Sequence, residues 1–195
     1  MQRTTTALIA AAALAAIAVP AGSAAARTAP SGLVYSTASA HTVQPQPRRD
    51  SCHMVGRGLS TRPDRHCTPG AANPAVTQAT IGSTICRSGW TATVRPSVSI
   101  TEPEKLASMA AYGLHGSPSA YEYDHDVPLE LGGAVNDPRN LWPERDYVGA
   151  SGFYKNPKDR LENALKHRVC RGAMTLAEAQ RAIASNWVTA AARFG

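Results

Sequence analysis

Four cysteines constrain the fold of this chain more than any other feature. Cys52, Cys67, Cys86 and Cys170 all lie after residue 51 of a 195-residue chain. An even number of cysteines behind an export signal predicts two disulfides, for which three connectivities are possible. We favour a local bridge between Cys52 and Cys67 and a long-range bridge between Cys86 and Cys170. A four-cysteine zinc site is disfavoured, because the chain has no Cys-x-x-Cys pair.

The first residues predict a secretory signal peptide. An apolar run from Ala7 to Val19 follows Arg3, and Ala24-Ala25-Ala26 supplies the small residues that a signal peptidase accepts. The run is short for a membrane span, so residues 1–26 are expected to be cleaved, leaving an extracellular protein without membrane attachment. An uncleaved anchor is the alternative. Residues 27–51 lack apolar periodicity, which predicts a disordered linker or pro-segment.

Residues 52–195 are long enough for one domain with a modest core, and their pattern predicts a small α+β fold. Glycines and prolines interrupt residues 52–74, which are therefore expected to be loops. A strand is expected between residues 85 and 100, where apolar residues alternate with threonines. Thr101 and Glu104 form a capping-box pattern, which predicts the start of a helix.

The second half of the domain predicts a hairpin followed by two helices. The segment from Tyr121 to Pro128 has the aromatic and β-branched residues of a strand, and residues 140–142 are expected to form a short returning strand. Asn156-Pro157 fits an N-cap followed by the first helical residue. Thr175 and Glu178 form a second capping box, and apolar residues follow at helical spacing.

An Asp-His pair, Asp124-His125, carries the chemistry that the sequence indicates. Hydrolysis of a phosphodiester needs a deprotonated water and relief of negative charge on the phosphate. Imidazole suits a general base near neutral pH, and a carboxylate suits Mg²⁺. Neighbours on a strand point to opposite faces, but the break at Pro128 can aim both side chains at one site. Asn140 is expected either to orient the imidazole or to pin the loop.

Three blocks in this order resemble the HNH nucleases of the ββα-metal (His-Me finger) superfamily, in an exported bacterial form. They are Asp-His-x-x-Pro-Leu-x-Leu-Gly-Gly from Asp124, Asn-Leu-Trp-Pro-Glu from Asn140 and Lys-Asp-x-x-Glu-Asn from Lys158. The resemblance implies a ββα-metal core at about residues 121–170, braced by disulfides and flanked by helices. It also implies an endonuclease that hydrolyses DNA, or alternatively RNA, with little sequence preference.

The resemblance assigns a role to each residue of the motif. It makes His125 the general base, Asp124 the first metal ligand and Asn140 the orienting amide. One divalent ion, Mg²⁺ first with Mn²⁺, Ca²⁺ or Zn²⁺ as alternatives, would bridge the scissile phosphate and the 3′ leaving oxygen. The His or Asn that many members carry in the first helical turn is absent here. Asp159 is our first choice for the helix ligand and Glu162 the second.

The formal net charge of +6 permits a nucleic-acid partner without identifying one. Four basic residues bracket the proposed site and are candidates for phosphate contacts: Arg139, Arg145, Lys155 and Lys158. Solvated surface charge is the competing interpretation of all four. DNA is the expected partner, no obligatory protein partner is expected, and the protein is expected to be a monomer.

Two other functions stay open. A disulfide-stapled extracellular binding module would use Asp124 and the Gly132-Gly133 loop to hold a structural cation such as Ca²⁺. A glycosidase would use Glu122 or Glu130 as acid or base, although nothing in the sequence fixes a second carboxylate at a defined distance. Asp126 and Glu130 are otherwise expected to be solvated or loop-capping groups.

Overall fold

The computed structural model describes residues 27–147 and 156–195, so the predicted signal peptide lies outside the described residues. The described residues form a small α+β domain with four α-helices, two small sheets and two disulfides. No helix in these two ranges is long and apolar enough to cross a membrane. In chain order the elements are β1 (Val34–Tyr35), β2 (Ala71–Ala72), α1 (Trp90–Val94), α2 (Val98–Ala111), β3 (Tyr121–His125), β4 (Leu141–Arg145), α3 (Pro157–Cys170) and α4 (Leu176–Phe194).

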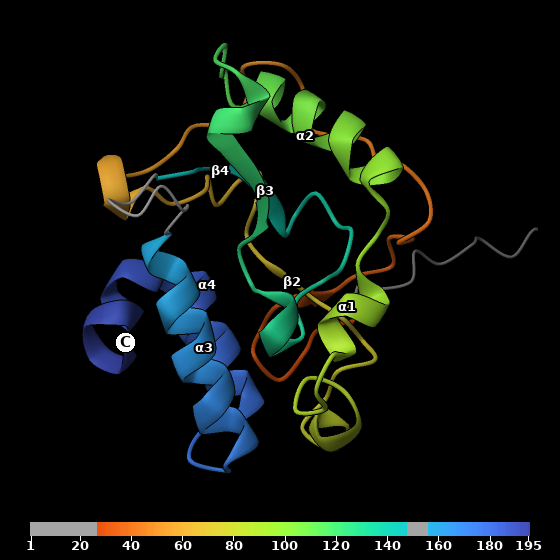
Figure 1. The fold of residues 1–195 in the computed structure, drawn as a ribbon, viewed down its shortest axis with the longest axis vertical. Coiled ribbons are helices and arrows are strands. Elements are labelled where there is room, and N and C mark those ends of the chain that lie inside the picture. The colour runs from red at the N-terminus through yellow and green to blue at the C-terminus, as the bar shows by residue number, and fades with distance from the viewer. Residues whose placement is uncertain (1–26, 148–155) are drawn as a thin grey trace, which may run out of the picture.

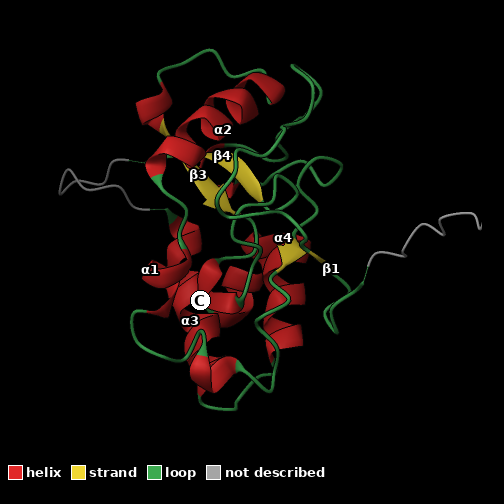
Figure 2. Cartoon of the chain, turned by 90° about the vertical axis from the view of Figure 1, so that its right-hand side faces the viewer, coloured by secondary structure: helices red, strands yellow, loops and turns green. Residues whose placement is uncertain are grey.

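The three long helices, α2, α3 and α4, lie on either side of the β3–β4 hairpin. The α3 and α4 helices lie side by side, and α2 lies at the opposite end of the molecule (Figure 1). Figure 2 shows β3 and β4 directly beneath α2, with α3 and α4 gathered at the other end. The hairpin therefore lies between the helix pair and α2.

The β3 and β4 strands pair antiparallel, with Tyr121 opposite Arg145 and His125 opposite Leu141. The strand and returning strand predicted from the sequence are confirmed, and β4 continues through Pro143. Proline is compatible with this position because each strand of a two-stranded sheet has one unpaired edge. The pairing brings the two inner ends of the hairpin together, so the connection between them folds back over His125.

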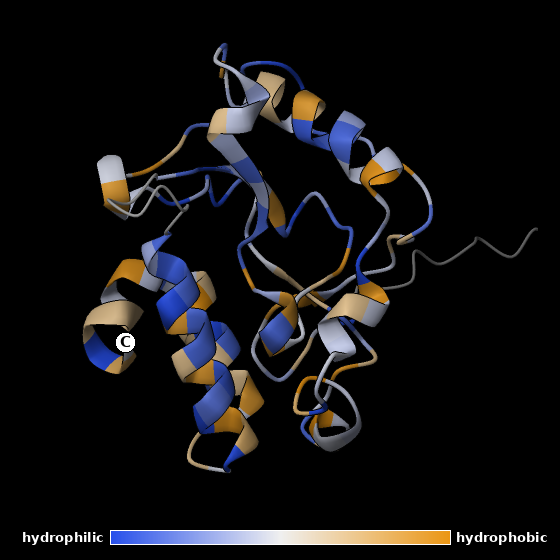
Figure 3. Ribbon diagram, viewed as in Figure 1, coloured by the Kyte–Doolittle hydropathy of each residue, from blue (hydrophilic) through white to orange (hydrophobic). Residues whose placement is uncertain are grey.

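The α3 helix begins at Pro157 directly after Asn156, as predicted. Leu161, Leu165 and Val169 are fully buried on its inner face and belong to the main apolar core. Figure 3 shows hydrophilic and hydrophobic residues alternating along α3 and α4. The apolar residues recur at helical spacing, so each helix turns one side toward the core.

The α4 helix has the capping box that the sequence predicts. The Thr175 hydroxyl accepts the backbone N–H of Glu178 at 3.2 Å, and the Glu178 carboxylate accepts the backbone N–H of Thr175 at 2.9 Å. Non-helical dihedral angles at Asn186 divide the helix into two segments. In the second segment, Trp187 donates its indole N–H to the Thr61 carbonyl at 3.1 Å. This contact fixes the end of α4 to a loop far away in the sequence.

Both favoured disulfides are present. Cys86–Cys170 joins the turn before α1 to the last residue of α3 and spans 84 residues of chain. Cys52–Cys67 closes a local loop of 15 residues. The first bridge borders the main apolar core, and the second belongs to a smaller cluster beside α2. Each end of the domain therefore has its own covalent link.

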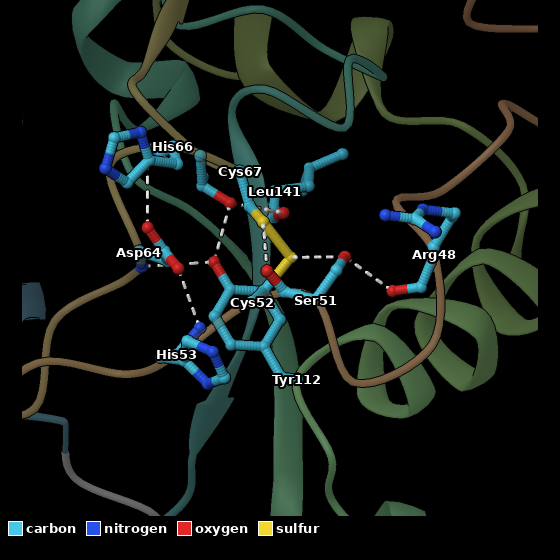
Figure 4. Close-up of a disulfide and its surroundings, with 10 residues drawn as sticks. Arg48, Ser51, Cys52, His53, Asp64, His66, Cys67, Tyr112 and Leu141 are labelled. Atoms are coloured by element: carbon cyan, nitrogen blue, oxygen red, sulfur yellow. Dashed lines mark hydrogen bonds between the residues drawn. A yellow bond between two sulfur atoms is a disulfide. The ribbon is translucent and has the colours of Figure 1, made fainter.

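The loops around the local bridge are ordered by buried hydrogen bonds as well (Figure 4). The Asp64 carboxylate accepts the backbone N–H groups of His53 at 2.7 Å and His66 at 2.8 Å. The Tyr112 hydroxyl accepts the backbone N–H of Asp64 at 3.2 Å and lies 2.8 Å from the Thr68 hydroxyl. These contacts tie a segment without regular structure to the end of α2.

The strand expected between residues 85 and 100 is wrong. This segment forms α1 and the beginning of α2 instead. The alternating pattern covered only five residues around Trp90–Val94, which is too few to separate a period of two from a single helical turn. Pro96 then ends α1, because the residue before a proline avoids the helical region.

The predicted capping box at Thr101 and Glu104 is wrong as well. The α2 helix begins one turn earlier, after Ser97, so both residues lie inside the helix. Glu104 is buried, and its Oε1 accepts the backbone N–H of Gln44 at 2.6 Å and the side-chain amide of Asn136 at 3.1 Å. The carboxylate therefore joins α2 to two distant loops instead of capping its own helix.

Residues 27–51 pack on the domain, in contrast to the predicted disordered linker. The β1 strand pairs in parallel with β2, and Ala29 and Leu33 belong to the main core. The Ser36 hydroxyl donates to the Asp137 carboxylate at 2.7 Å. Composition missed this packing because a few small apolar residues and backbone hydrogen bonds hold the segment without any long apolar run. Its removal as a pro-segment stays a prediction.

Candidate active site

His125 is the last residue of β3 and has only 8% of its surface exposed. Its Nε2 lies 3.1 Å from the backbone carbonyl of Val135. A carbonyl can only accept a hydrogen bond, so in the neutral ring Nε2 carries the proton and Nδ1 presents a lone pair. Burial lowers the pKa of His125 to about 4, although the charge of Asp124 opposes this shift. The imidazole is therefore neutral at pH 7.

His125 lines a cleft of about 570 Å³ between β3 and the beginning of α2. Arg95 and Lys105 bring positive charge to the cleft wall, and the charge of Arg95 contributes to the low pKa of His125. Within the described ranges, Arg95 forms no salt bridge. Glu102, Glu122 and Asp146 line the same cleft, so its wall carries charges of both signs around a neutral imidazole.

Lys158 lies among three carboxylates, none of which lines the cleft of His125. Its side chain is fully buried, and its Nζ donates to Oδ2 of Asp124 and, at 2.5 Å, to Oε1 of Glu162. Oε2 of Glu144 lies 3.6 Å from the same nitrogen. The carboxylates come from β3, α3 and β4, so one ammonium connects the hairpin to the helix.

Each charge in this cluster shifts the pKa of its neighbours. Burial alone would raise the pKa of Asp124, but the charge and hydrogen bond of Lys158, a hydrogen bond from Glu144 and the charge of His125 together outweigh burial and lower it. Burial raises the pKa of Glu144 and of Glu162, and the charge of Asp124 adds to both shifts against the opposing charge of Lys158. Burial alone would lower the pKa of Lys158, but the three carboxylates raise it well above its ordinary value. Lys158 is therefore protonated throughout the physiological pH range.

Asn140 pins the loop between the strands, which is the second of the two roles that the sequence left open. Its Oδ1 accepts the backbone N–H of Val127 at 3.0 Å and that of Ala71 at 3.3 Å. Its Nδ2 donates to the carbonyls of Val127 and Ala134, both at 3.0 Å. The side chain is fully buried and its amide is saturated. Asn140 is thus a positioning residue that fixes the loop carrying Val135.

Asp126 and Glu130 do not behave alike, although both were expected to be solvated or loop-capping. Asp126 is buried, and its Oδ2 has no hydrogen-bond partner in the described part of the chain. Burial raises its pKa to about 7. Glu130 forms an ion pair with Lys166 of α3 at 3.6 Å and does not line the cleft of His125. The expectation is therefore wrong for Asp126.

The residues predicted to hold a metal ion do not form one coordination site. Asp159, the first choice on the helix, is exposed. Glu162 and Asp124 both accept a hydrogen bond from Lys158. Over residues 27–147 and 156–195, no three His, Cys, Asp or Glu side chains are arranged to hold an ion. As arranged, the site does not fit a divalent cation, because the ammonium of Lys158 lies between the carboxylates. The same pairing occupies the carboxylate that the binding-module alternative needs.

The four basic residues predicted to contact phosphate differ in their surroundings. Arg139 bonds the Asp137 carboxylate at two points, 2.9 Å from Nε and 2.6 Å from Nη2. Arg145 is exposed at the end of β4. Lys155 lies outside the described residues. The prediction is wrong for Lys158, because a fully buried ammonium cannot reach a phosphate in solution.

Two residues beside the site, Glu144 and Arg95, were not predicted. Glu144 belongs to the second motif block, but nothing in its pattern distinguishes a buried carboxylate from an exposed one. Arg95 was hidden by the wrong strand assignment. The burial of Lys158 did have a sequence pattern, because Leu161 and Leu165 follow it at three and seven residues and share its helix face.

Comparison with known proteins identifies no relative of this chain, so any functional assignment depends on its own residues. No protein-family model, curated protein or solved structure matches this chain. The resemblance to HNH nucleases therefore stays a prediction from the three motif blocks, and the domain itself is established as a small disulfide-linked α+β fold.

Proposed function

We propose that this protein is an extracellular endonuclease that hydrolyses phosphodiester bonds of DNA with little sequence preference, RNA being the alternative substrate. The observation that carries the proposal is the neutral imidazole of His125, which Val135 holds in one tautomer at the wall of a cleft. The three motif blocks and the net charge of +6 support the same activity.

His125 supplies the general base in this proposal. Nε2 is committed to the carbonyl of Val135, so Nδ1 is the atom that takes a proton from water. The hydroxide attacks phosphorus, the bond from phosphorus to the 3′ oxygen breaks, and the 3′ oxygen takes a proton from solvent. Since the pKa of His125 is about 4, the base stays unprotonated into mildly acidic solution. The role of Asn140 is to keep the loop with Val135 in place.

Positive charge at the cleft wall supplies the contacts to phosphate. Arg95 and Lys105 line the same cleft as His125. A guanidinium can bond two phosphate oxygens at once, which suits Arg95 for the phosphate under attack. Arg145 stands opposite Tyr121, another residue of the cleft wall, and can contact a neighbouring phosphate.

Secretion is part of the proposal. Two disulfides fit an oxidising compartment, and residues 1–26 have the pattern of a cleavable signal peptide. The mature protein would act as a monomer on DNA outside the cell, without an obligatory protein partner.

A plasmid digestion assay tests the proposal with wild type, His125→Ala and His115→Ala. Loss of a general base lowers the cleavage rate by roughly 10² to 10⁴-fold, so His125→Ala should be nearly inactive. His115 is exposed, and its substitution should change nothing. Melting curves of all three proteins check that the variants are folded.

The pH profile of the wild type gives a second readout that needs no variant. The acid limb of the cleavage rate should lie near pH 4, because burial keeps His125 neutral above its pKa of about 4. An acid limb at an ordinary histidine value, or full activity in a folded His125→Ala protein, would reject His125 as the base.

A further inference from the structure

Lys158 occupies a position that is unfavourable for an isolated lysine. It lies in the first turn of α3, where the helix dipole disfavours positive charge. Its side chain is also fully buried, and moving an ammonium out of water is costly unless opposite charges surround it. The position of Lys158 therefore depends on the carboxylates around it.

Those acidic groups bond two of the three donors of the ammonium and place a third oxygen within salt-bridge distance. A lysine has three N–H donors. Asp124 of β3 accepts one of them, Glu162 of α3 accepts another at 2.5 Å, and Glu144 of β4 lies within salt-bridge distance at 3.6 Å. Ionising all three acidic groups at such short range is unfavourable without a cation between them, and burial together with the charge of Asp124 accordingly raises the pKa of Glu144 and of Glu162.

A divalent ion bound by carboxylates in a protein likewise offsets the repulsion among them. Hard oxygen ligands from several elements converge on it, and its charge offsets their repulsion. Lys166 shows by contrast what an ordinary lysine of the same helix does. It meets one carboxylate, Glu130, at 3.6 Å, and a third of its side chain is exposed, at 33%. Of the two lysines on α3, Lys158 is the one that is enclosed as an ion would be.

We infer that Lys158 is the built-in cation of this site and stands where the motif leads one to expect a bound divalent ion. It follows that neither the fold nor the proposed DNA cleavage requires added divalent metal. The part that concerns cleavage rests on the proposed function, whereas the part that concerns folding and metal binding does not.

The wild-type protein gives the first test. Protein treated with EDTA and then dialysed should keep its melting temperature, and Mg²⁺, Mn²⁺ or Ca²⁺ should leave that temperature unchanged. Calorimetric titration with Mn²⁺ should detect no stoichiometric site. DNA cleavage should proceed at the same rate with EDTA as with Mg²⁺. One tight Mn²⁺ site in the wild type, or cleavage that stops in EDTA and returns with Mg²⁺, would overturn the inference.

Lys158→Met gives the second test, with Lys166→Met as the matched control on the same helix. Removing the enclosed cation should lower the melting temperature by roughly 10 °C. The vacated carboxylates should then accept Mn²⁺, and saturating metal should return about 5 °C or more. Lys166→Met should melt like the wild type and stay insensitive to metal.

Two further results keep the inference testable. If Lys158→Met does not fold alone, the double variant Lys158→Met with Glu144→Gln removes one buried carboxyl, leaves Asp124 and Glu162 to hold the metal, and should fold. A stable Lys158→Met protein that gains no affinity for Mn²⁺ would show that the carboxylates do not need a cation, and would contradict the inference. Absence of cleavage under all conditions would reject the proposed nuclease while leaving the metal-binding result to stand by itself.

Discussion

Two buried regions meet along α3, and different forces hold them together. Towards the C-terminal end of the helix, Leu165 and Val169 lie in the apolar core against α4. The Cys86–Cys170 bridge closes this end. In the first turn of the same helix, Lys158 is enclosed by carboxylates of β3, β4 and α3 itself.

The difference shows how one helix can combine two kinds of stability. Apolar burial is roughly proportional to the area removed from water and involves no titrating group, so it varies little with pH. In the charged region, the contribution of Lys158 to stability depends on the charge of its acidic partners. The free energy of unfolding therefore depends on pH. Substitutions at the two ends of α3 should therefore differ in how much stability they remove and in whether that loss depends on pH.

The largest effect is expected from the long-range bridge of the apolar region. Replacing Cys86 and Cys170 by serine frees a loop of 84 residues and should lower the free energy of unfolding by about 4.5 kcal/mol. The same change at Cys52 and Cys67, with a loop of 15 residues, should cost about 3 kcal/mol. Urea denaturation of both double variants measures the two values. Equal or reversed costs would show that loop length does not set the difference between the two ends.

A smaller effect is expected from Leu165→Ala, which leaves a cavity in the apolar region. Leu165 is fully buried, so the free energy of unfolding should fall by about 3 kcal/mol. The loss should be the same at pH 4 and pH 8.5, because no charge is involved. Denaturation at both pH values checks this, with Leu106→Ala on the exposed side of α2 as the control. A pH-dependent loss would mean that the two regions are not separable.

The smallest effect, and the one that depends on pH, is expected from Asp126→Asn beside the charged cluster. The folded-state pKa is about 7, against 3.8 for an ordinary aspartate, so between these values the folded protein holds a proton that the unfolded chain has lost. Wild-type stability therefore falls as the pH rises from about 4 to 7, and the full loss persists above pH 7. The asparagine variant does not titrate and should escape this loss.

The expected result is a variant that matches the wild type at pH 4 and exceeds it by about 2 kcal/mol at pH 8.5. The gain stays below the full electrostatic term because a buried amide must find its own hydrogen bonds. Paired denaturation curves at the two pH values measure it. A constant difference would indicate that Asp126 is ionised throughout, and the burial argument would then be wrong.

The sequence predicted those elements whose formation depends on residues close to one another in the chain. The capping box of Thr175 and Glu178 and the Asn156-Pro157 start depend on a few neighbouring residues, so the sequence located both helix starts correctly, although the Asn156 side chain forms no capping hydrogen bond. The two disulfides and the strands of the hairpin were also predicted, because spacing and pattern limited the alternatives. The α1 helix was missed since five residues between loops leave the period of the pattern undetermined.

The environment of the charged site could not be predicted, because it depends on contacts between distant segments. Lys158 was expected outside on account of its charge, and its place at three and seven residues before Leu161 and Leu165 was the better guide. Asp126 was expected in solvent, and no local pattern marks a carboxylate that three-dimensional packing buries. For Asn140 the sequence left two roles open, and only the fold could decide between them.

The long-range bridge also imposes an order on how the chain can acquire its cysteine pairs during synthesis. Cys52 and Cys67 are made close together and can join while the rest of the chain is still unfinished. Cys86 must wait for 84 further residues, and in that interval its thiol can attack the earlier bridge or join the wrong partner. The yield of native protein should therefore depend on how fast the local pair closes and on whether a disulfide isomerase is at hand to repair early mistakes.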